Sequence, residues 1–145
     1  MQQNLFQKAE SAQLLIATIL KYRDAGEFRL HDFAVMPNHL HAVLSVDDGK
    51  TIGRAVQLIK GGFSHALHQS GGARTVWQPG YYEHRVRDRG EYQRIRSYIV
   101  HNPVRRNLAA RADDYGYSSI NAIDRLDEVP EGLKPVDCGT SLTPA

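Results

Sequence analysis

The chain has 145 residues, of which 41% are hydrophobic, and a formal net charge of +2. This length and composition are typical of one globular domain that buries its own core. No apolar run approaches the roughly 20 residues of a membrane-spanning helix, and no signal-peptide pattern opens the chain. The single cysteine, Cys138, has no partner for an internal disulfide, so we expect a cytoplasmic location.

Charge is distributed unevenly along the chain. Residues 54–111 contain eleven lysines and arginines against three acidic residues, whereas residues 112–145 contain two against seven. A basic segment within a folded domain indicates either a polyanionic partner or a solvated surface. Charge alone does not choose between the two.

The first part of the chain predicts a helix followed by a β-hairpin. Residues 7–25 have helical apolar spacing and are followed by Gly26, a helix stop signal. Residues 27–36 predict a strand, Pro37-Asn38 a turn, and residues 39–46 a second strand. We expect the two strands to pair in antiparallel fashion.

The middle of the chain predicts a further helix, strand and helix. Thr51 is an N-cap residue for a helix that reaches about His68. A strand is expected to start at Tyr81, and residues 89–102 have the apolar spacing of a helix. Pro103 is expected to end or kink that helix, because proline disfavours the α conformation in the residue before it.

This order of elements predicts an α+β fold, a ferredoxin-like sandwich in which an antiparallel sheet carries the helices on one face. A complete unit of this type begins with one more strand, for which the first residues leave no room. We expect one domain over residues 1–128. Residues 129–145 contain several prolines and acidic residues, and we expect them to form a flexible tail.

Two histidines stand one residue apart at the start of the second predicted strand. Because side chains alternate along a strand, His39 and His41 share one face, while Leu40 and Leu44 share the other, apolar face. Two neighbouring imidazoles can share a metal ion. A lone His-x-His pattern is a weak signal, however, and a site needs a third ligand and a reacting group.

The predicted helix over residues 89–102 offers both a third ligand and a reacting group. Tyr98 and Asn102 are four residues apart and therefore lie on one helix face. Two imidazoles and an amide oxygen suit a divalent ion such as Mn²⁺ or Mg²⁺, which can polarise a phosphodiester for attack by a tyrosine. The competing interpretation is a half-buried core tyrosine and an asparagine that caps the helix before proline.

Three motifs in sequence order carry a family resemblance: VMPNHLHAVLSV, VWQPGYYEHRVRD and YIVHNPVRRNL. They resemble the motifs of single-tyrosine HUH transposases of the IS200-like group, and within it those of the REP-associated tyrosine transposases. The resemblance extends over residues 5–119, which is nearly the whole predicted domain.

The resemblance implies a metal-dependent endonuclease and strand transferase that acts on single-stranded DNA. By the family pattern, His39, His41 and Asn102 hold the divalent metal ion, Mg or Mn, and Tyr98 is the nucleophile. The tyrosine forms a 5′-phosphotyrosine link and releases a 3′-hydroxyl, and no nucleotide cofactor is needed. The implied substrates are hairpin-forming repeats.

A single-stranded or hairpin DNA partner also accounts for the basic segment, because phosphate contacts dominate nucleic-acid affinity. The candidate DNA contacts are Lys60, Arg85, Arg87, Arg105 and Arg106. With such a partner we expect a cytoplasmic, nucleoid-associated protein without a membrane association. Whether it is a monomer or a dimer stays open.

The family's first strand, which lies beside the histidine strand, has no counterpart in the sequence. Three explanations are open: the protein starts upstream of Met1, another chain supplies the strand, or the domain is degenerate. Without it, a three-stranded sheet would expose an unpaired inner edge and invite association.

Two other functions compete with the transferase. One is a non-catalytic protein that binds DNA hairpins and has lost cleavage. The other is a small metallo-phosphoesterase, for which Asp47 and Asp48 are the only acidic residues near the histidines in the sequence.

Overall fold

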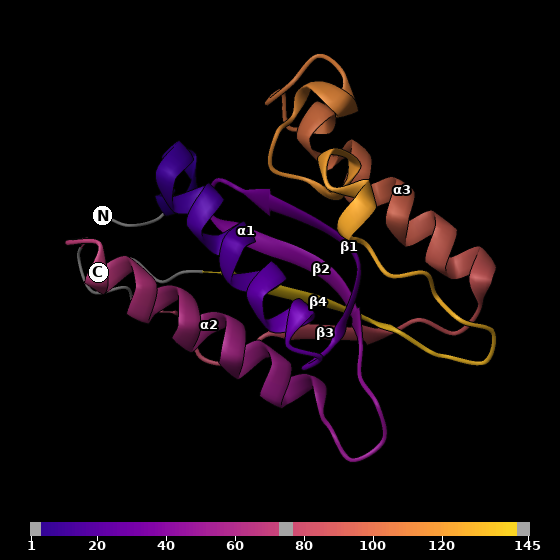
Figure 1. The fold of residues 1–145 in the computed structure, drawn as a ribbon. Helices are drawn as coiled ribbons and strands as arrows, with labels where there is room; N and C mark the ends of the chain where they lie inside the picture. The colour runs from indigo at the N-terminus through magenta and orange to yellow at the C-terminus, as the bar shows by residue number, and fades with distance from the viewer. Residues whose placement is uncertain (1–3, 73–76, 142–145) are drawn as a thin grey trace.

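The computed structural model describes residues 4–72 and 77–141. Its helices and strands are α1 (Ala9–Asp24), β1 (Arg29–Met36), β2 (His39–Ser45), α2 (Ile52–Gln69), β3 (Tyr82–Arg85), α3 (Arg89–Arg105) and β4 (Val136–Ser141). The strands form one antiparallel sheet in the order β1-β2-β4-β3 (Figure 1), which confirms the predicted α+β class. Across the described residues, no helix has the length and apolarity that a membrane span requires.

The predicted hairpin is present. β1 and β2 pair in antiparallel fashion across the turn at Pro37-Asn38, with Val35 opposite Leu40 and Met36 opposite His39. Leu40 and Leu44 are buried in the larger core, as the alternation in the sequence predicts.

The fourth strand comes from the segment predicted to be a flexible tail, and that prediction is wrong for Val136–Ser141. β4 lies between β2 and β3 and pairs with both, so the expected three-stranded sheet with an open inner edge is also wrong. Backbone ladders on both sides and the burial of Val136 and Cys138 stabilise a strand whose own β-propensity is weak. Residues 142–145 of the predicted tail lie outside the described residues.

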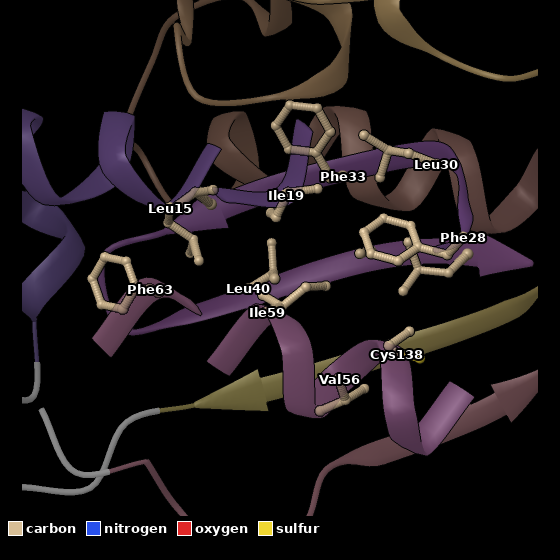
Figure 2. Packing of buried hydrophobic residues seen from close by; sticks show 14 of the residues in the cluster. Leu15, Ile19, Phe28, Leu30, Phe33, Leu40, Val56, Ile59, Phe63 and Cys138 are labelled. Carbon is tan, nitrogen blue, oxygen red and sulfur yellow. The ribbon is translucent and has the colours of Figure 1, made fainter. Parts of the chain in front are cut away.

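Helices lie on both faces of the sheet, so the expectation that all helices share one face is wrong for α3 (Figure 1). Side chains of α1 and α2, such as Leu15 and Ile59, pack on the face that contains Leu40 (Figure 2). α3 packs on the opposite face through Ile99, which joins a small cluster of Ala34, Met36 and Val43. The hairpin is apolar on both faces and therefore needs a cover on both.

α3 also continues further than predicted. The helix does not end at Pro103 but extends to Arg105, and the amide of Arg106 still donates to the carbonyl of Asn102 at 3.0 Å. Pro103 is buried, and packing compensates for the one backbone hydrogen bond that proline cannot make. The helix ends where Asn107 adopts the left-handed conformation, with φ of 58°.

The segment after α3 covers the outer edge of β1. The Val35 amide donates to the Tyr117 carbonyl at 2.8 Å, and the Asp127 amide donates to the Leu30 carbonyl at 2.7 Å. The Asp127 carboxylate in turn accepts from the guanidinium of Arg23 in α1. These contacts occupy part of the edge that another chain could otherwise pair with.

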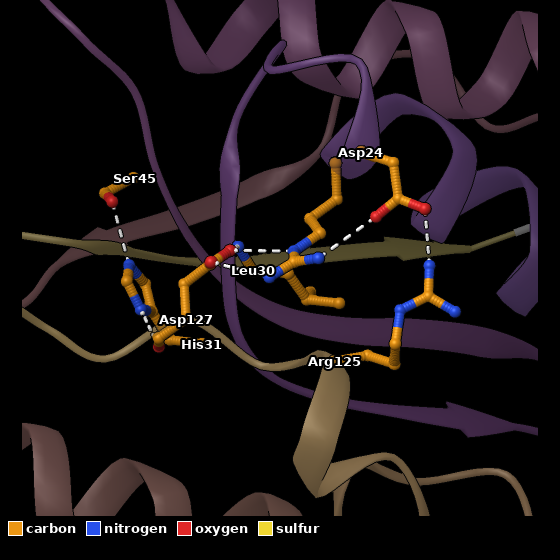
Figure 3. A network of polar contacts seen from close by, with 7 residues as sticks. Asp24, Leu30, His31, Ser45, Arg125 and Asp127 are labelled. Carbon is orange, nitrogen blue, oxygen red and sulfur yellow. Dashed lines mark hydrogen bonds and ion pairs between the residues drawn. The ribbon is translucent and has the colours of Figure 1, made fainter.

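His31 lies toward one end of this network, next to Asp127, and gives stability a pH dependence. Its Nδ1 donates to the Asp127 carbonyl at 2.7 Å, and its Nε2 lies 2.8 Å from the Ser45 hydroxyl (Figure 3). Burial lowers the pKa of His31 below its ordinary value. Below about pH 6.5 the unfolded chain gains a proton here that the folded chain does not, and the free energy of unfolding falls.

We therefore expect His31→Gln to flatten the loss of stability between about pH 7 and pH 5, measured by urea unfolding. His65 is exposed on α2, and His65→Gln is the matched control that keeps the wild-type slope. Equal slopes for the wild type and His31→Gln would contradict this assignment.

Candidate active site

The two histidines of β2 lie side by side on the face of the sheet that α3 covers, which we call the histidine face. The ring centroids of His39 and His41 are 5.9 Å apart. Leu40 and Leu44 pack on the opposite face in the core of α1 and α2. The predicted common orientation of the two imidazoles is thus confirmed.

His39 is held as a neutral imidazole. Its Nδ1 lies 2.8 Å from the side-chain oxygen of Asn38, which can only accept, so Nδ1 carries the hydrogen and Nε2 keeps a lone pair. Burial, and then the charges of His41 and Arg106, lower the pKa of His39 to about 4. A neutral imidazole with a free nitrogen is the form that binds a metal ion.

His41 faces a residue that the sequence analysis did not select. Its Nδ1 lies 3.3 Å from Oδ1 of Asp137 in β4. Both atoms are buried, and neither has a hydrogen-bond partner in the described part of the chain. The sequence predicts a tail over residues 129–145 and therefore does not identify Asp137. The alternation of apolar Val136 and Cys138 around it was the available signal.

Tyr98 lies next to His41. α3 places its ring centroid 6.0 Å from that of His41, and the residue is 49% exposed. The guanidinium of Arg105 stacks on the Tyr98 ring at 4.3 Å and also donates to the Tyr98 carbonyl. Asn102 is buried one turn further along the helix.

A buried carboxylate fixes α3 to the sheet near the site. Asp32 of β1 is fully buried and accepts a hydrogen bond from the Tyr92 hydroxyl. The Arg96 guanidinium lies 3.3 Å from the same carboxylate, and the Ser119 hydroxyl donates to it at 3.1 Å. Burial raises the pKa of Asp32. Sequence reasoning missed this anchor, because an aspartate in an apolar strand has no partner visible in the sequence.

An open pocket lies in front of the histidines. His39 and His41 line it together with Gly139 of β4 and residues 78–82. Residues 78–82 belong to the motif VWQPGYYEHRVRD, and the first residue of that motif lies outside the described residues. Lys60 shapes this segment, because its ammonium donates to the carbonyls of residues 78 and 80 at 3.0 and 2.6 Å. The structure thus gives Lys60 an intramolecular role, and its predicted DNA contact stays a prediction.

The four candidate arginines differ in position. Arg105 lies on Tyr98, and Arg106 follows α3, close enough for its charge to act on His39. Arg87 is tied to Glu91 at 2.7 Å, and Arg85 is exposed on β3. Only the first two are therefore brought to the histidine pair.

The donor set fits one divalent metal ion. Two imidazoles bound to one ion at about 2.1 Å have ring centres about 5 Å apart, close to the separation of His39 and His41. No group of three histidine, cysteine or acidic side chains in the described residues is arranged to hold a metal. A third ligand would have to be of another type, and the predicted Asn102 amide is such a ligand. Asp47 ion-pairs with Arg29 beyond the far end of β2, which removes support for the metallo-phosphoesterase alternative.

The fold and the site define an α+β protein in which an imidazole pair and a helical tyrosine meet on one face of the sheet. Residues 2–102 match the family described as "Transposase IS200 like". The chain belongs to this family.

Two curated relatives and one solved structure show the likeness in more detail. The REP-associated tyrosine transposase of Escherichia coli (strain K12) is 27% identical over 132 residues, which are 90% of this chain and 74% of the relative. An uncharacterized protein of Haemophilus influenzae is 29% identical over 100 residues, covering 54% of this chain and 56% of the relative. The solved structure of a REP-associated tyrosine transposase bound to a REP hairpin matches with a TM-score of 0.64 and 26% identity over 76% of this chain. The present chain spans 65% of that solved chain.

Proposed function

We propose that the chain cleaves and rejoins single-stranded DNA at hairpin-forming repeats, with Tyr98 as the nucleophile. The observation that carries the proposal is the position of Tyr98, half exposed and 6.0 Å from the ring of His41 in the imidazole pair. Membership of the IS200-like transposase family supports it, as does the likeness to a protein solved with a REP hairpin.

The Tyr98 hydroxyl oxygen attacks the phosphorus of a phosphodiester and gives up its proton. The bond from phosphorus to the 3′ oxygen breaks, and that oxygen takes a proton and leaves as a 3′-hydroxyl. The 5′ phosphate stays on the tyrosine. A second 3′-hydroxyl reverses the step and joins a new strand, so the energy of the phosphodiester is retained and no nucleotide is consumed.

His39 and His41, with Asn102 as third ligand, would hold a divalent ion, Mg²⁺ or Mn²⁺, that polarises the phosphodiester. His39 contributes a neutral imidazole whose tautomer is fixed by Asn38. Arg105 holds the Tyr98 ring in place by stacking on it. These residues orient the reacting groups before DNA binds.

DNA affinity would come from arginines around the site. Arg105 and Arg106 are next to the tyrosine and the histidines and would contact the phosphate at the cleaved position. Arg85, Arg87 and Lys60 would contact more distant phosphates. A cytoplasmic, nucleoid-associated location remains the expectation for such a protein.

The test is a covalent adduct formed with Mn²⁺ and a labelled DNA hairpin. Because Tyr98 retains the 5′ phosphate, a label on the 3′ end should stay on the protein after denaturation, and a label on the 5′ end should appear on a shortened free strand. Hairpin binding without any adduct would instead identify a non-catalytic hairpin-binding protein.

His41→Ala should abolish the adduct while hairpin binding is retained, because it removes half of the imidazole pair and no DNA-binding arginine. We expect a loss of at least about 100-fold in the cleavage rate, partly restored at high Mn²⁺ concentration. His65→Ala, at an exposed position on α2, is the control. Undiminished cleavage by His41→Ala would exclude a role for the imidazole pair.

A further inference from the structure

β4 presents one acidic side chain to the histidine face. Val136 and Cys138 are buried in the core under α2, so alternation along the strand turns Asp137 to the other side. Asp137 is only 9% exposed and lies opposite Val43 of β2. It stands outside residues 2–102, so the family match assigns it no role.

The environment of Asp137 points to His41. The 3.3 Å between His41 Nδ1 and Asp137 Oδ1 separates two buried atoms that have no hydrogen-bond partner in the described residues. A buried polar atom without a partner is unfavourable. An imidazole N–H and a carboxylate are complementary, so each group offers what the other lacks.

The other nitrogen of His41 is directed elsewhere. Its Nε2 lies 4.0 Å from the position that a Cβ atom would take on Gly139, a residue that lines the open pocket together with His39. His39 shows the same division of roles, since its Nδ1 donates to Asn38. Each imidazole thus has an oxygen next to Nδ1.

We propose that Asp137 is a positioning residue, which accepts a hydrogen bond from Nδ1 of His41 and so leaves the Nε2 lone pair free for a metal ion in the pocket. Oxygen acceptors behind metal-bound imidazoles fix the tautomer and the ring orientation, and their loss costs 10- to 100-fold in metal affinity. The inference rests on the proposed function for its metal ion. It makes β4 part of the site.

The first experiment needs no metal and no DNA. Nitrogen-15 NMR of the imidazoles at about pH 8, where neutral histidines prevail, reports which nitrogen of His41 carries the hydrogen. We expect hydrogen on Nδ1 in the wild-type chain and a shift toward hydrogen on Nε2 in Asp137→Ala. A wild-type His41 with its hydrogen on Nε2 would overturn the proposal without any variant.

The second experiment is a titration with Mn²⁺ by calorimetry. Asp137→Ala should weaken binding by about 10- to 100-fold, and Asp137→Asn, which keeps an acceptor oxygen, should weaken it less. Glu83→Ala is the control, because Glu83 lies opposite Cys138 and therefore on the other face of the sheet. Unchanged affinity and an unchanged His41 tautomer in folded Asp137→Ala would refute the role of Asp137.

The two experiments separate this inference from the proposed function. Suppose that the wild-type chain binds no Mn²⁺, but that the tautomer of His41 shifts between the wild type and Asp137→Ala. This result would refute the metal site and support the pairing of Asp137 with His41. A wild-type chain that binds Mn²⁺ with no effect of Asp137→Ala on affinity or tautomer would leave the metal site standing and overturn the inference.

Discussion

Tyr98→Phe is expected to reduce formation of the covalent protein–DNA adduct by at least about 1,000-fold, because it removes the oxygen that attacks phosphorus in the proposed mechanism. The ring is 49% exposed and the change removes no apolar contact, so folding should be unaffected. The Arg105 stacking remains possible, and hairpin binding should stay within about twofold of the wild type. Adduct formation on a denaturing gel and hairpin binding by fluorescence anisotropy measure the two effects.

The matched control is Tyr22→Phe. Tyr22 packs beside Gly62 between α1 and α2, on the opposite face of the sheet, so the same chemical change there should leave the adduct unaffected. An adduct that persists in Tyr98→Phe would place the nucleophile elsewhere. Tyr81 and Tyr82, which line the pocket with the histidines, would then be next in line.

A chain that ends after Glu128 should lose cooperative unfolding and aggregate. In the described residues β2 and β3 are not paired with each other and are joined through β4, so the deletion leaves two open strand edges. It also removes Val136 and Cys138 from the core. Burial of a side chain such as valine contributes about 1.5–3 kcal/mol, and each hydrogen bond contributes about 1 kcal/mol. The sum of these losses approaches the roughly 5–15 kcal/mol free energy of unfolding of a typical domain.

Thermal unfolding with light scattering measures this effect. A chain that ends after Ser141 keeps β4 and is the control for shortening as such. Cys138→Asp is a second test within the full chain, since it places a carboxylate among the apolar side chains under α2. A cooperative, monomeric chain without β4 would mean that the sheet closes without this strand.

The histidine strand and the tyrosine helix could be predicted because each pattern is local. Alternation over residues 39–46 determines which face both imidazoles occupy, and the four-residue spacing of Tyr98 and Asn102 determines their common helix face. The residues of α3 alone do not determine on which face of the sheet the helix packs. That choice depends on Ala34 and other residues of the hairpin, which make its second face apolar as well.

The strand at Val136–Ser141 could not be predicted from its own residues. Aspartate, glycine and serine disfavour strands, and prolines precede the segment. It is extended because two neighbouring strands supply hydrogen-bond partners on both sides and the core accepts Val136. The role of Asp137 could not be predicted either, because its contact with His41 joins residues far apart in the chain.

The position of β4 in the chain has a consequence for biosynthesis. A ribosome completes β1, β2, β3 and α3 before it makes β4, the strand that joins β2 to β3. A nascent chain that has emerged through Tyr98 therefore already contains that tyrosine and both histidines, but its sheet is still in two parts. Because long-range pairing such as that of Leu44 with Val136 forms late, the sheet that holds these side chains is complete only after β4 has been made.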